Sequence, residues 1–192
     1  DAERVKTRWG SALGFHGIRL VIVPAESAPG VPSERVDSVA AGFAAVPEDC
    51  DHVAIHDAAR PLVEPELIDK VFHEAAATGA AIAAVPLAAT LKRVDEAPAN
   101  DWGVIKRTIA GTVPRDSLWL AQTPQVFRFD LLRTAFAQAS SDNFTGTDEA
   151  SLVERLEQVE VSVVAGSDRN IKLTKPTDMK LAHLFLAEER GL

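Results

Sequence analysis

Three short apolar runs, separated by segments with helical spacing, constrain the fold of this chain more than any other feature of its sequence. The runs are residues 18–23 (IRLVIV), 53–55 (VAI) and 81–86 (AIAAVP), each with the length and composition of a buried β-strand. Strands that alternate with helices predict βαβ units, whose crossovers are right-handed. We therefore expect an α/β fold with a doubly wound, mostly parallel sheet.

The two segments between these runs are predicted helices. In the first, Ser33 can act as the N-cap, and Val36 and Phe43 belong to an apolar stripe with spacings of three and four residues. The second begins near Pro65 and stops at Gly79, residue types that are common at the start of a helix and just beyond its end. Both helices should pack on the sheet.

The second half of the chain predicts two further strands. Residues 122–127 form one, and residues 159–165 alternate between apolar and polar side chains, which places them near a sheet edge. Helices are expected around residues 131–137, from Thr147 as N-cap, and after Pro176. The sheet and its helices thus continue to the C-terminal region.

The two ends of the chain give simpler signals. Residues 1–17 indicate a frayed helix that ends by Gly17. The last helix should use Leu181, Leu184 and Phe185 as its apolar face.

Residues 90–112 interrupt the alternation of strands and helices. Two runs that favour β-structure, residues 90–94 and 104–109, flank the turn-rich residues 95–101. This pattern predicts a projecting β-hairpin arm. Because its alternation leaves little one-sided apolar surface for the core, we expect the arm to pack on another subunit of a homodimer.

Size and composition indicate one domain, residues 1–192. The net charge of -8 argues against a nucleic-acid or anionic-membrane partner, so any phosphate site must be built from a few placed cations. The most apolar stretch is broken by Gly79 and Pro86, and it predicts neither a membrane span nor a signal peptide. The single Cys50 favours a reducing, cytoplasmic location and supplies no metal cluster.

The stretch HDAARP at residues 56–61 is the first candidate for chemistry. It directly follows an apolar run, so Asp57 and Arg60 should leave a strand at its carboxyl end, where open α/β sheets bind ligands. A carboxylate there can hold a metal ion or a sugar hydroxyl, and a guanidinium can hold a phosphate. The alternative is structural: Asp57 caps the loop and pairs with Arg60.

Four more polar residues are candidates. Lys172 lies between apolar neighbours after a strand and suits a phosphate oxygen; the alternative is a lysine that snorkels from an edge strand. Arg115 is expected at the start of a short helix containing Trp119, where the helix dipole disfavours a cation unless a phosphate or an acidic neighbour compensates. Thr90 and Thr123 are ordinary hydroxyl donors at a strand exit and before a proline.

Seven short motifs follow one another along the chain. They are ERVDSV (34–39), HDAARP (56–61), TLKR (90–93), VPR (113–115), QTPQVF (122–127), TDEA (147–150) and NIKLT (170–174). In this order they closely resemble the 2-C-methyl-D-erythritol 4-phosphate cytidylyltransferase family of the non-mevalonate isoprenoid pathway. The resemblance runs from about Ile18 to the C-terminus, and HDAARP and TPQxF are specific to this family and its nearest sugar- and alditol-phosphate relatives.

The resemblance implies a Rossmann-like nucleotidyltransferase fold and a reaction. CMP would pass from CTP to the 4-phosphate of methylerythritol with release of pyrophosphate, and Mg²⁺ would be bound mainly through the CTP phosphates. It also implies a homodimer in which the hairpin arm completes the partner's site. By position, the residues implied are Arg35 and Ser38 for the nucleotide, Asp57 and Arg60 at the junction of the two substrates, Arg115 and Lys172 for positioning the acceptor phosphate, and Thr90 and Thr123 for its hydroxyl contacts.

The chain departs from the family pattern at its start. The family begins with a strand and a glycine-rich loop whose arginine and lysine wrap the triphosphate, and Gly10, Gly14 and Gly17 do not have the spacing of that loop. Val31 and Pro32 stand where the family usually has two glycines. We expect that segments are missing from this sequence. A protein with these residues alone is expected to bind poorly and turn over slowly.

Two alternatives remain open from the sequence. The first is a cytidylyltransferase for another polyol phosphate, such as ribitol 5-phosphate, which shares most of these motifs. The second, favoured by the absent glycine-rich loop, is a non-catalytic nucleotide-binding homologue.

Overall fold

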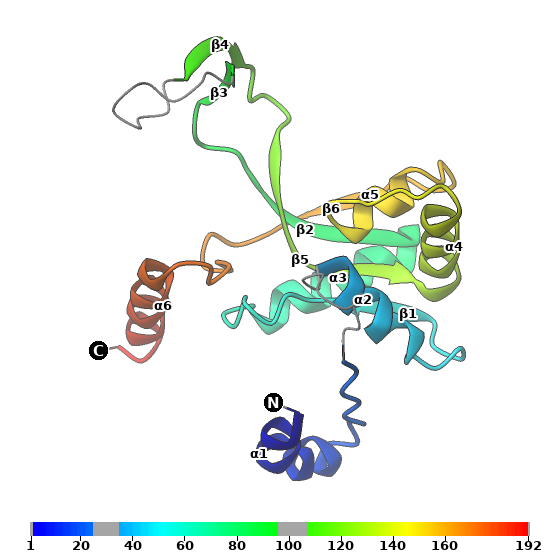
Figure 1. Ribbon diagram of the computed structural model, residues 1–192. Helices are drawn as coiled ribbons and strands as arrows, with labels where there is room; N and C mark the ends of the chain where they lie inside the picture. Colours follow the sequence, from blue (N-terminus) through cyan, green and yellow to red (C-terminus); the bar gives the residue numbers. More distant parts are fainter. Residues whose placement is uncertain (1, 25–34, 96–106, 192) are drawn as a thin grey trace, which may run out of the picture.

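The computed structural model describes residues 2–24, 35–95 and 107–191, and Figure 1 shows their arrangement. The predicted N-cap Ser33 and the middle of the predicted arm, residues 96–106, lie outside these ranges. The elements in chain order are α1 (Ala2–Phe15), α2 (Arg35–Ala44), β1 (His52–Ile55), α3 (Pro65–Thr78), β2 (Ala80–Pro86), β3 (Leu91–Asp95), β4 (Thr108–Val113), β5 (Trp119–Arg128), α4 (Phe129–Ser141), α5 (Glu149–Glu154), β6 (Ser162–Ala165) and α6 (Pro176–Glu189).

The central sheet has the strand order β1-β5-β2-β6. β2 pairs parallel with β6, whereas β5 pairs antiparallel with both β1 and β2. Three strands therefore share one direction and β5 runs against them, so the α/β class is confirmed and the sheet is mixed. The reason is topological: β5 returns directly from the β3–β4 arm, and such a return connects antiparallel neighbours.

Helices cover both faces of this sheet. On one face, α3 packs Leu67, Val71 and Ala75 against Ala81 and Val126. On the other face, α4 and α5 form the larger core cluster with side chains of β1, β2 and β5, and α2 adds Val39 and Phe43. The doubly wound arrangement is thus confirmed.

Local sequence signals explain why α3 forms where it does. Pro65 occupies its first turn, where a backbone N–H would have no acceptor within the helix, so the lack of an N–H in proline costs nothing. Gly79 ends the helix in the left-handed region with φ 94°, and its N–H bonds to the carbonyl of Ala75. The chain then turns directly into β2, whose first half is buried without interruption.

The predicted strand at residues 18–23 is wrong. These residues have no regular secondary structure, and the side chains of Ile18 and Val21 are about half exposed. A strand needs a neighbour for its backbone N–H and C=O groups, and in the described part of the chain none pairs with this segment. Within the described sheet, β1 lies at an edge.

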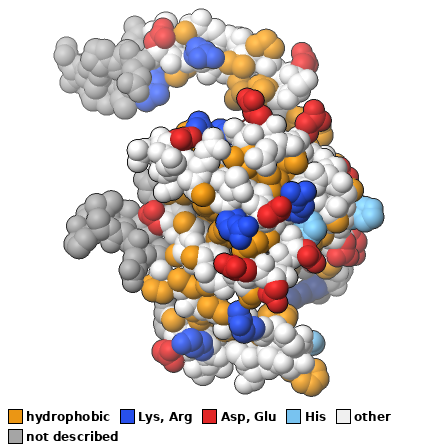
Figure 2. Space-filling view, turned by 90° about the vertical axis from the view of Figure 1, so that its right-hand side faces the viewer, with side chains coloured by type: hydrophobic (Ala, Val, Ile, Leu, Met, Phe, Trp, Pro, Cys, Tyr) orange, Lys and Arg blue, Asp and Glu red, His pale blue; other side chains and the backbone are white. Residues whose placement is uncertain are grey.

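The arm is a separate two-stranded sheet. β3 and β4 pair antiparallel from Leu91↔Val113 to Asp95↔Thr108, with an irregularity between Arg93 and Val94. Every residue of β3 is exposed. Figure 2 shows the arm as a lobe that stands apart from the body, with basic and acidic side chains interspersed on the face in view.

Helix α6 differs from its prediction. Leu181 and Leu184, the expected apolar face, are 40% and 61% exposed, and the buried residue is Ala182. Figure 1 shows α6 standing to one side of the sheet. None of the helices within the described ranges combines the length and apolarity that a membrane crossing needs.

Two local predictions in the second half of the chain also need correction. The segment from Arg115 does not begin a helix: it turns, and Trp119 starts β5. The N-cap of α5 is Asp148, whose side chain accepts a hydrogen bond from the N–H of Ser151 at 3.0 Å, in place of Thr147. Asp is at least as good an N-cap as Thr, so the sequence alone did not separate the two neighbours.

Candidate functional site

Five of the eight predicted site residues line one cleft with a volume of about 270 Å³. They come from the start of α2, the loop after β1, strand β5 and the segment after β6, and they are Arg35, Asp57, Arg60, Thr123 and Lys172. The cleft lies at the carboxyl end of β1, as expected for a ligand site in an open α/β sheet.

The carboxylate of Asp57 is the centre of this cleft. Nε of Arg35 donates to its Oδ1 at 3.0 Å, and Nζ of Lys172 lies 3.1 Å from Oδ2. Nε of Arg60 is 3.4 Å from the same Oδ2. The structural alternative for Asp57 is therefore partly right, because Asp57 does pair with Arg60, but two further cations share its carboxylate.

These contacts determine the charge state of Asp57. Burial pushes the pKa of its carboxyl group upward, but hydrogen bonds and attraction from Arg35 and Lys172 outweigh burial and hold the pKa below its usual range. Asp57 is thus a stable anion whose charge three cations share.

Glu149 is a site residue that the sequence did not reveal. Its two carboxylate oxygens accept from Nη1 and Nη2 of Arg35 at 2.7 and 2.8 Å, and its side chain is 2% exposed. The hydrogen bond to Glu149 is the main reason why the pKa of Arg35 is raised, against the effect of burial. An acidic residue in the first turn of a helix is common, so nothing in the sequence singled out this partner.

Backbone contacts bring the segment after β6 to the loop after β1. The N–H of Leu173 donates to the carbonyl of Ala59 at 2.8 Å, and Nη1 of Arg60 donates to the carbonyl of Asn170 at 2.7 Å. Asn170 is fully buried, and its side-chain amide donates to the carbonyl of Thr123 at 2.8 Å. These bonds place Lys172 beside Asp57.

His56 is a second residue whose role could not be read from the sequence. Its Nε2 is 3.0 Å from the carbonyl of Arg60, and its Nδ1 is 3.0 Å from Oγ1 of Thr123. The same Oγ1 accepts from the backbone N–H of Asp57 at 3.0 Å. A neutral ring with the proton on Nε2 satisfies all three contacts, so His56 and Thr123 fix the loop to β5.

Another wall of the cleft is made by the N-terminus of α5. The buried Gln125 donates from Nε2 to Oδ2 of Asp148 at 2.9 Å and accepts from the N–H of Ala150 at 3.2 Å. Among the residues that the structure describes, Asp148 and Asp57 are the two carboxylates that line the cleft. Both already accept hydrogen bonds from nitrogen donors.

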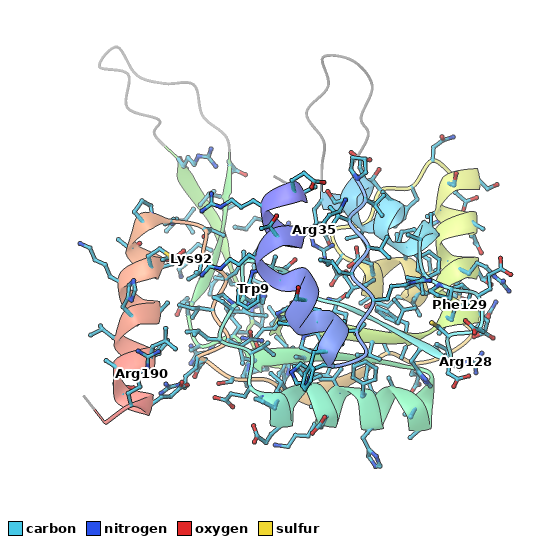
Figure 3. The ribbon with its side chains drawn as sticks, turned by 90° about the horizontal axis from the view of Figure 1, so that it is seen from below. Trp9, Arg35, Lys92, Arg128, Phe129 and Arg190 are labelled. Atoms are coloured by element: carbon cyan, nitrogen blue, oxygen red, sulfur yellow. The ribbon has the colours of Figure 1, made fainter. Side chains whose placement is uncertain are left out.

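The remaining three predicted site residues do not line this cleft. Ser38 is exposed on α2. Thr90 and Arg115 lie exposed at the base of the arm. Arg115 donates a hydrogen bond from Nη1 to the carbonyl of Ala88. In Figure 3, Lys92 of β3 lies on the opposite side of the molecule from Arg128 and Phe129 at the start of α4.

The cleft offers few of the oxygen ligands that Mg²⁺ needs. Among the described residues, no group of three or more His, Cys, Asp or Glu side chains is arranged to hold a metal ion. Mg²⁺ usually takes one or two protein carboxylates together with phosphate and water oxygens. Asp57 and Asp148 fit that limited role only, so a metal here would be bound largely through phosphates.

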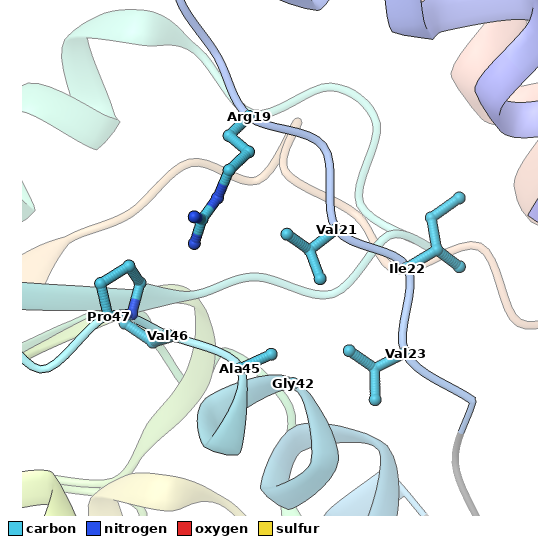
Figure 4. A pocket seen from close by; sticks show the side chains of 8 residues that line it. All are labelled: Arg19, Val21, Ile22, Val23, Gly42, Ala45, Val46 and Pro47. Atoms are coloured by element: carbon cyan, nitrogen blue, oxygen red, sulfur yellow. The ribbon is translucent and has the colours of Figure 1, made fainter.

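A larger hollow, of about 660 Å³, lies between residues 19–23 and the end of α2 (Figure 4). Arg19 is the one charged side chain among the described residues that line it. Its other walls are Val21, Ile22, Val23, Gly42, Ala45, Val46 and Pro47. Because its described lining residues include no converging polar groups, this hollow is a poorer candidate for chemistry than the smaller cleft.

A mixed α/β sheet with converging cations at a strand end defines a domain that can hold a phosphorylated ligand, and comparison with known proteins identifies the family. The family model described as "IspD: 2-C-methyl-D-erythritol 4-phosphate cytidylyltransferase" matches residues 29–188. The chain therefore belongs to the 2-C-methyl-D-erythritol 4-phosphate cytidylyltransferase family.

Individual relatives agree. The chain is 54% identical over 157 residues to the cytidylyltransferase of Solibacter usitatus, covering 82% of this chain and 62% of that protein. It is 46% identical over 189 residues to that of Acidobacterium capsulatum, covering 98% and 73%. The chain thus spans roughly two thirds of the length of these relatives.

Solved structures show the same likeness. The crystal structure of the cytidylyltransferase from Thermus thermophilus has a TM-score of 0.69 and 29% identity, over 93% of this chain and 87% of that one. The 4-diphosphocytidyl-2C-methyl-D-erythritol synthase from Anaerococcus prevotii has a TM-score of 0.75 and 25% identity, over 95% and 77%.

Proposed function

We propose that this chain catalyses the transfer of CMP from CTP to 2-C-methyl-D-erythritol 4-phosphate, with release of pyrophosphate. The observation that carries the proposal is the convergence of Arg35, Arg60 and Lys172 on Asp57 in one cleft, in a chain of this family. A cytoplasmic location is part of the proposal and rests on the composition.

The chemistry requires charge neutralisation more than acid–base catalysis. An oxygen of the acceptor phosphate forms a bond to the α-phosphorus of CTP, and the bond from that phosphorus to the bridging oxygen of pyrophosphate breaks. The nucleophile is already ionised near neutral pH, so no protein group has to remove a proton. Rate then depends on in-line positioning and on cations that offset the growing negative charge.

Lys172 is the cleft cation that we assign to the acceptor phosphate. It is 39% exposed, and among the described residues its only ion pair is with Asp57. Arg60 is held by backbone carbonyls as well as by Asp57, so it supplies a fixed charge at the junction of the two substrates. Mg²⁺, bound through the CTP phosphates, would further neutralise them.

The assignments of Arg35 and Thr123 are adjusted by their contacts. Three of the five N–H groups of Arg35 are used by Asp57 and Glu149, which leaves two for a nucleotide. The hydroxyl of Thr123 already bonds with His56 and Asp57, so its contribution to the acceptor is one lone pair. Ser38 on the exposed side of α2 remains assigned to the nucleotide.

The position of Arg115 and Thr90 supports a shared site. Neither is among the residues that line the cleft containing Lys172 in one chain. An arm that docks on a second copy would bring both residues to the partner's cleft. The exposure of every residue of β3 agrees with an arm that needs another surface.

The test is turnover by the native protein, followed as formation of the diphosphate product by ³¹P NMR. Methylerythritol 4-phosphate should be converted in the presence of CTP and Mg²⁺, and ribitol 5-phosphate should react much more slowly. Faster reaction with ribitol 5-phosphate would replace the proposed acceptor. Binding of CTP without any turnover would instead identify a non-catalytic homologue. If Lys172 is replaced by Ala to test its assignment, Lys180→Ala on the exposed surface of α6 is the matched control.

A further inference from the structure

A buried carboxylate behind the cleft holds one of its cations. Glu149 is 2% exposed and is not among the residues that line the cleft, yet both of its oxygens bond to Arg35. The third contact of the same guanidinium goes to Asp57, which does line the cleft. Glu149, Arg35 and Asp57 therefore form a chain of alternating charge that leads from the core to the ligand site.

The geometry constrains both the position and the orientation of Arg35. A bidentate contact to a carboxylate fixes the plane of the guanidinium as well as its position. Glu149 is itself fixed, because it lies in the first turn of α5, whose N-cap Asp148 is held by Gln125. Lys172, by contrast, reaches Asp57 through a single ammonium group at the end of a flexible stem.

Charge compensation follows from the same contacts. A carboxylate as buried as Glu149 requires a paired cation. The positive charge of Arg35 is therefore already balanced by Glu149 inside the protein. Arg35 thus acts on Asp57 chiefly as a brace, and Arg60 and Lys172 are the two cleft cations that Glu149 does not neutralise.

We propose that Glu149 is a positioning residue: it locks Arg35 against Asp57 and keeps the guanidinium from moving onto a bound phosphate. Asp57 then stays in place when the ammonium group of Lys172 leaves it and binds the acceptor phosphate. The inference deepens the proposed function and rests on it for the turnover measurement, but not for the binding measurement described below.

The test separates positioning from general stability by the direction of two effects. Glu149→Gln removes the lock and frees the charge of Arg35. The affinity for inorganic phosphate, used as the probe in calorimetry, should therefore rise by about fivefold because one more charge-assisted contact is available. The kcat with CTP and methylerythritol phosphate should fall by about tenfold or more because the braced geometry is lost.

Three variants control this experiment. Glu149→Asp retains the charge and should recover part of the lost kcat. Glu154→Gln removes the same charge from an exposed position on the same helix and should match wild type in both measurements. In Arg35→Gln/Glu149→Gln, the gain in phosphate affinity should disappear, because the freed cation is gone.

Several outcomes would overturn the proposal. Affinity and kcat that fall together with the melting temperature would mean that Glu149 only stabilises the fold, and no change in either would mean that it does nothing for the site. If Glu149→Gln does not fold, stability decides: Arg35→Gln leaves Glu149 buried and unpaired, so it must be less stable than the double variant. Equal stability would show that the pair is not coupled. If wild type shows no turnover, the proposed function fails. The phosphate affinities of wild type and Glu149→Gln still test whether Glu149 holds Arg35 in place.

Discussion

Nζ of Lys172 lies 3.1 Å from Oδ2 of Asp57, and this is the ion pair of the cleft with the fewest other anchors. Arg35 is also held by Glu149, and Arg60 by the carbonyl of Asn170. Because Lys172 alone can leave Asp57 without breaking a second contact among the described residues, it is the cation best placed to move onto a ligand.

Lys172→Ala should therefore affect turnover more than nucleotide binding. If Lys172 holds the nucleophilic phosphate, its removal should lower kcat by roughly 100-fold or more, because an attacking group loses its alignment. The dissociation constant for CTP, measured by calorimetry, should change by less than about threefold. A comparable loss of CTP affinity would place Lys172 on the nucleotide side of the cleft.

Asp57 should contribute to stability in a pH-dependent way. Its pKa in the folded protein is lower than its ordinary value of 3.8, because Arg35 and Lys172 outweigh the effect of burial. The stabilisation is fully present above that value and is lost as the pH falls through the lower folded pKa. Asp57→Asn should be less stable than wild type at pH 7 by about 1–3 kcal/mol.

Chemical denaturation at a series of pH values checks this prediction. The difference between wild type and Asp57→Asn should shrink as the pH is lowered below about 4, since protonated Asp57 no longer attracts the three cations. A difference that stays constant or widens in acid would show that the ion pairs do not stabilise the folded state. Asp69→Asn, on the exposed side of α3, is the control for the loss of one carboxylate.

The sequence predicted those parts of the fold that depend on local signals. α3 was predicted from its apolar spacing and from Pro65 and Gly79, and these residues act within one or two turns of the helix. Residues 18–23 look like a strand by the same local criteria. They are not one, because a strand exists only if another strand pairs with it, and pairing is not encoded within six residues.

The same limit applies to the site. Asp57 and Lys172 were identified by their type and by their place after strands, and the structure brings them together. Glu149 and His56 were not identified, because their roles depend on partners that are distant in sequence, Arg35 and Thr123. Residue type and strand order predict which end of the sheet carries the site, whereas tertiary packing determines which residues support it.

A shared site predicts complementation between inactive variants. Arg115→Ala and Lys172→Ala should each be inactive alone. In a mixed dimer both lesions fall in one of the two sites, and the other site is intact. Random exchange gives about half mixed dimers with one good site of two, so roughly a quarter of wild-type activity should return.

Subunit exchange has to be verified by native mass spectrometry before the result is interpreted. Activity that stays absent after verified exchange would show that Arg115 and Lys172 serve the same subunit. The arm would then have a structural role only.

The core and the exposed helix α6 should differ in their sensitivity to truncation. Leu132 is fully buried in the cluster of α4 and β5, so Leu132→Ala should lower the free energy of unfolding by about 2–5 kcal/mol. Leu184 is 61% exposed, so Leu184→Ala should change it by less than about 0.5 kcal/mol. Denaturant titration measures both, and a large effect at Leu184 would reveal that α6 is covered by a second copy in solution.

The isolation of the β3–β4 arm has a consequence for the time scale on which the chain opens. A two-stranded hairpin without a covering layer is marginally stable in water, so its amide hydrogens should exchange with solvent through local opening. Those of β2 and β5, whose side chains fill the core, should exchange only when the whole domain unfolds. If a second chain covers the arm, amide exchange in the arm should slow as the protein concentration rises, whereas exchange in the central sheet should not change. The exchange rate of the arm would therefore show whether a second chain is bound to it.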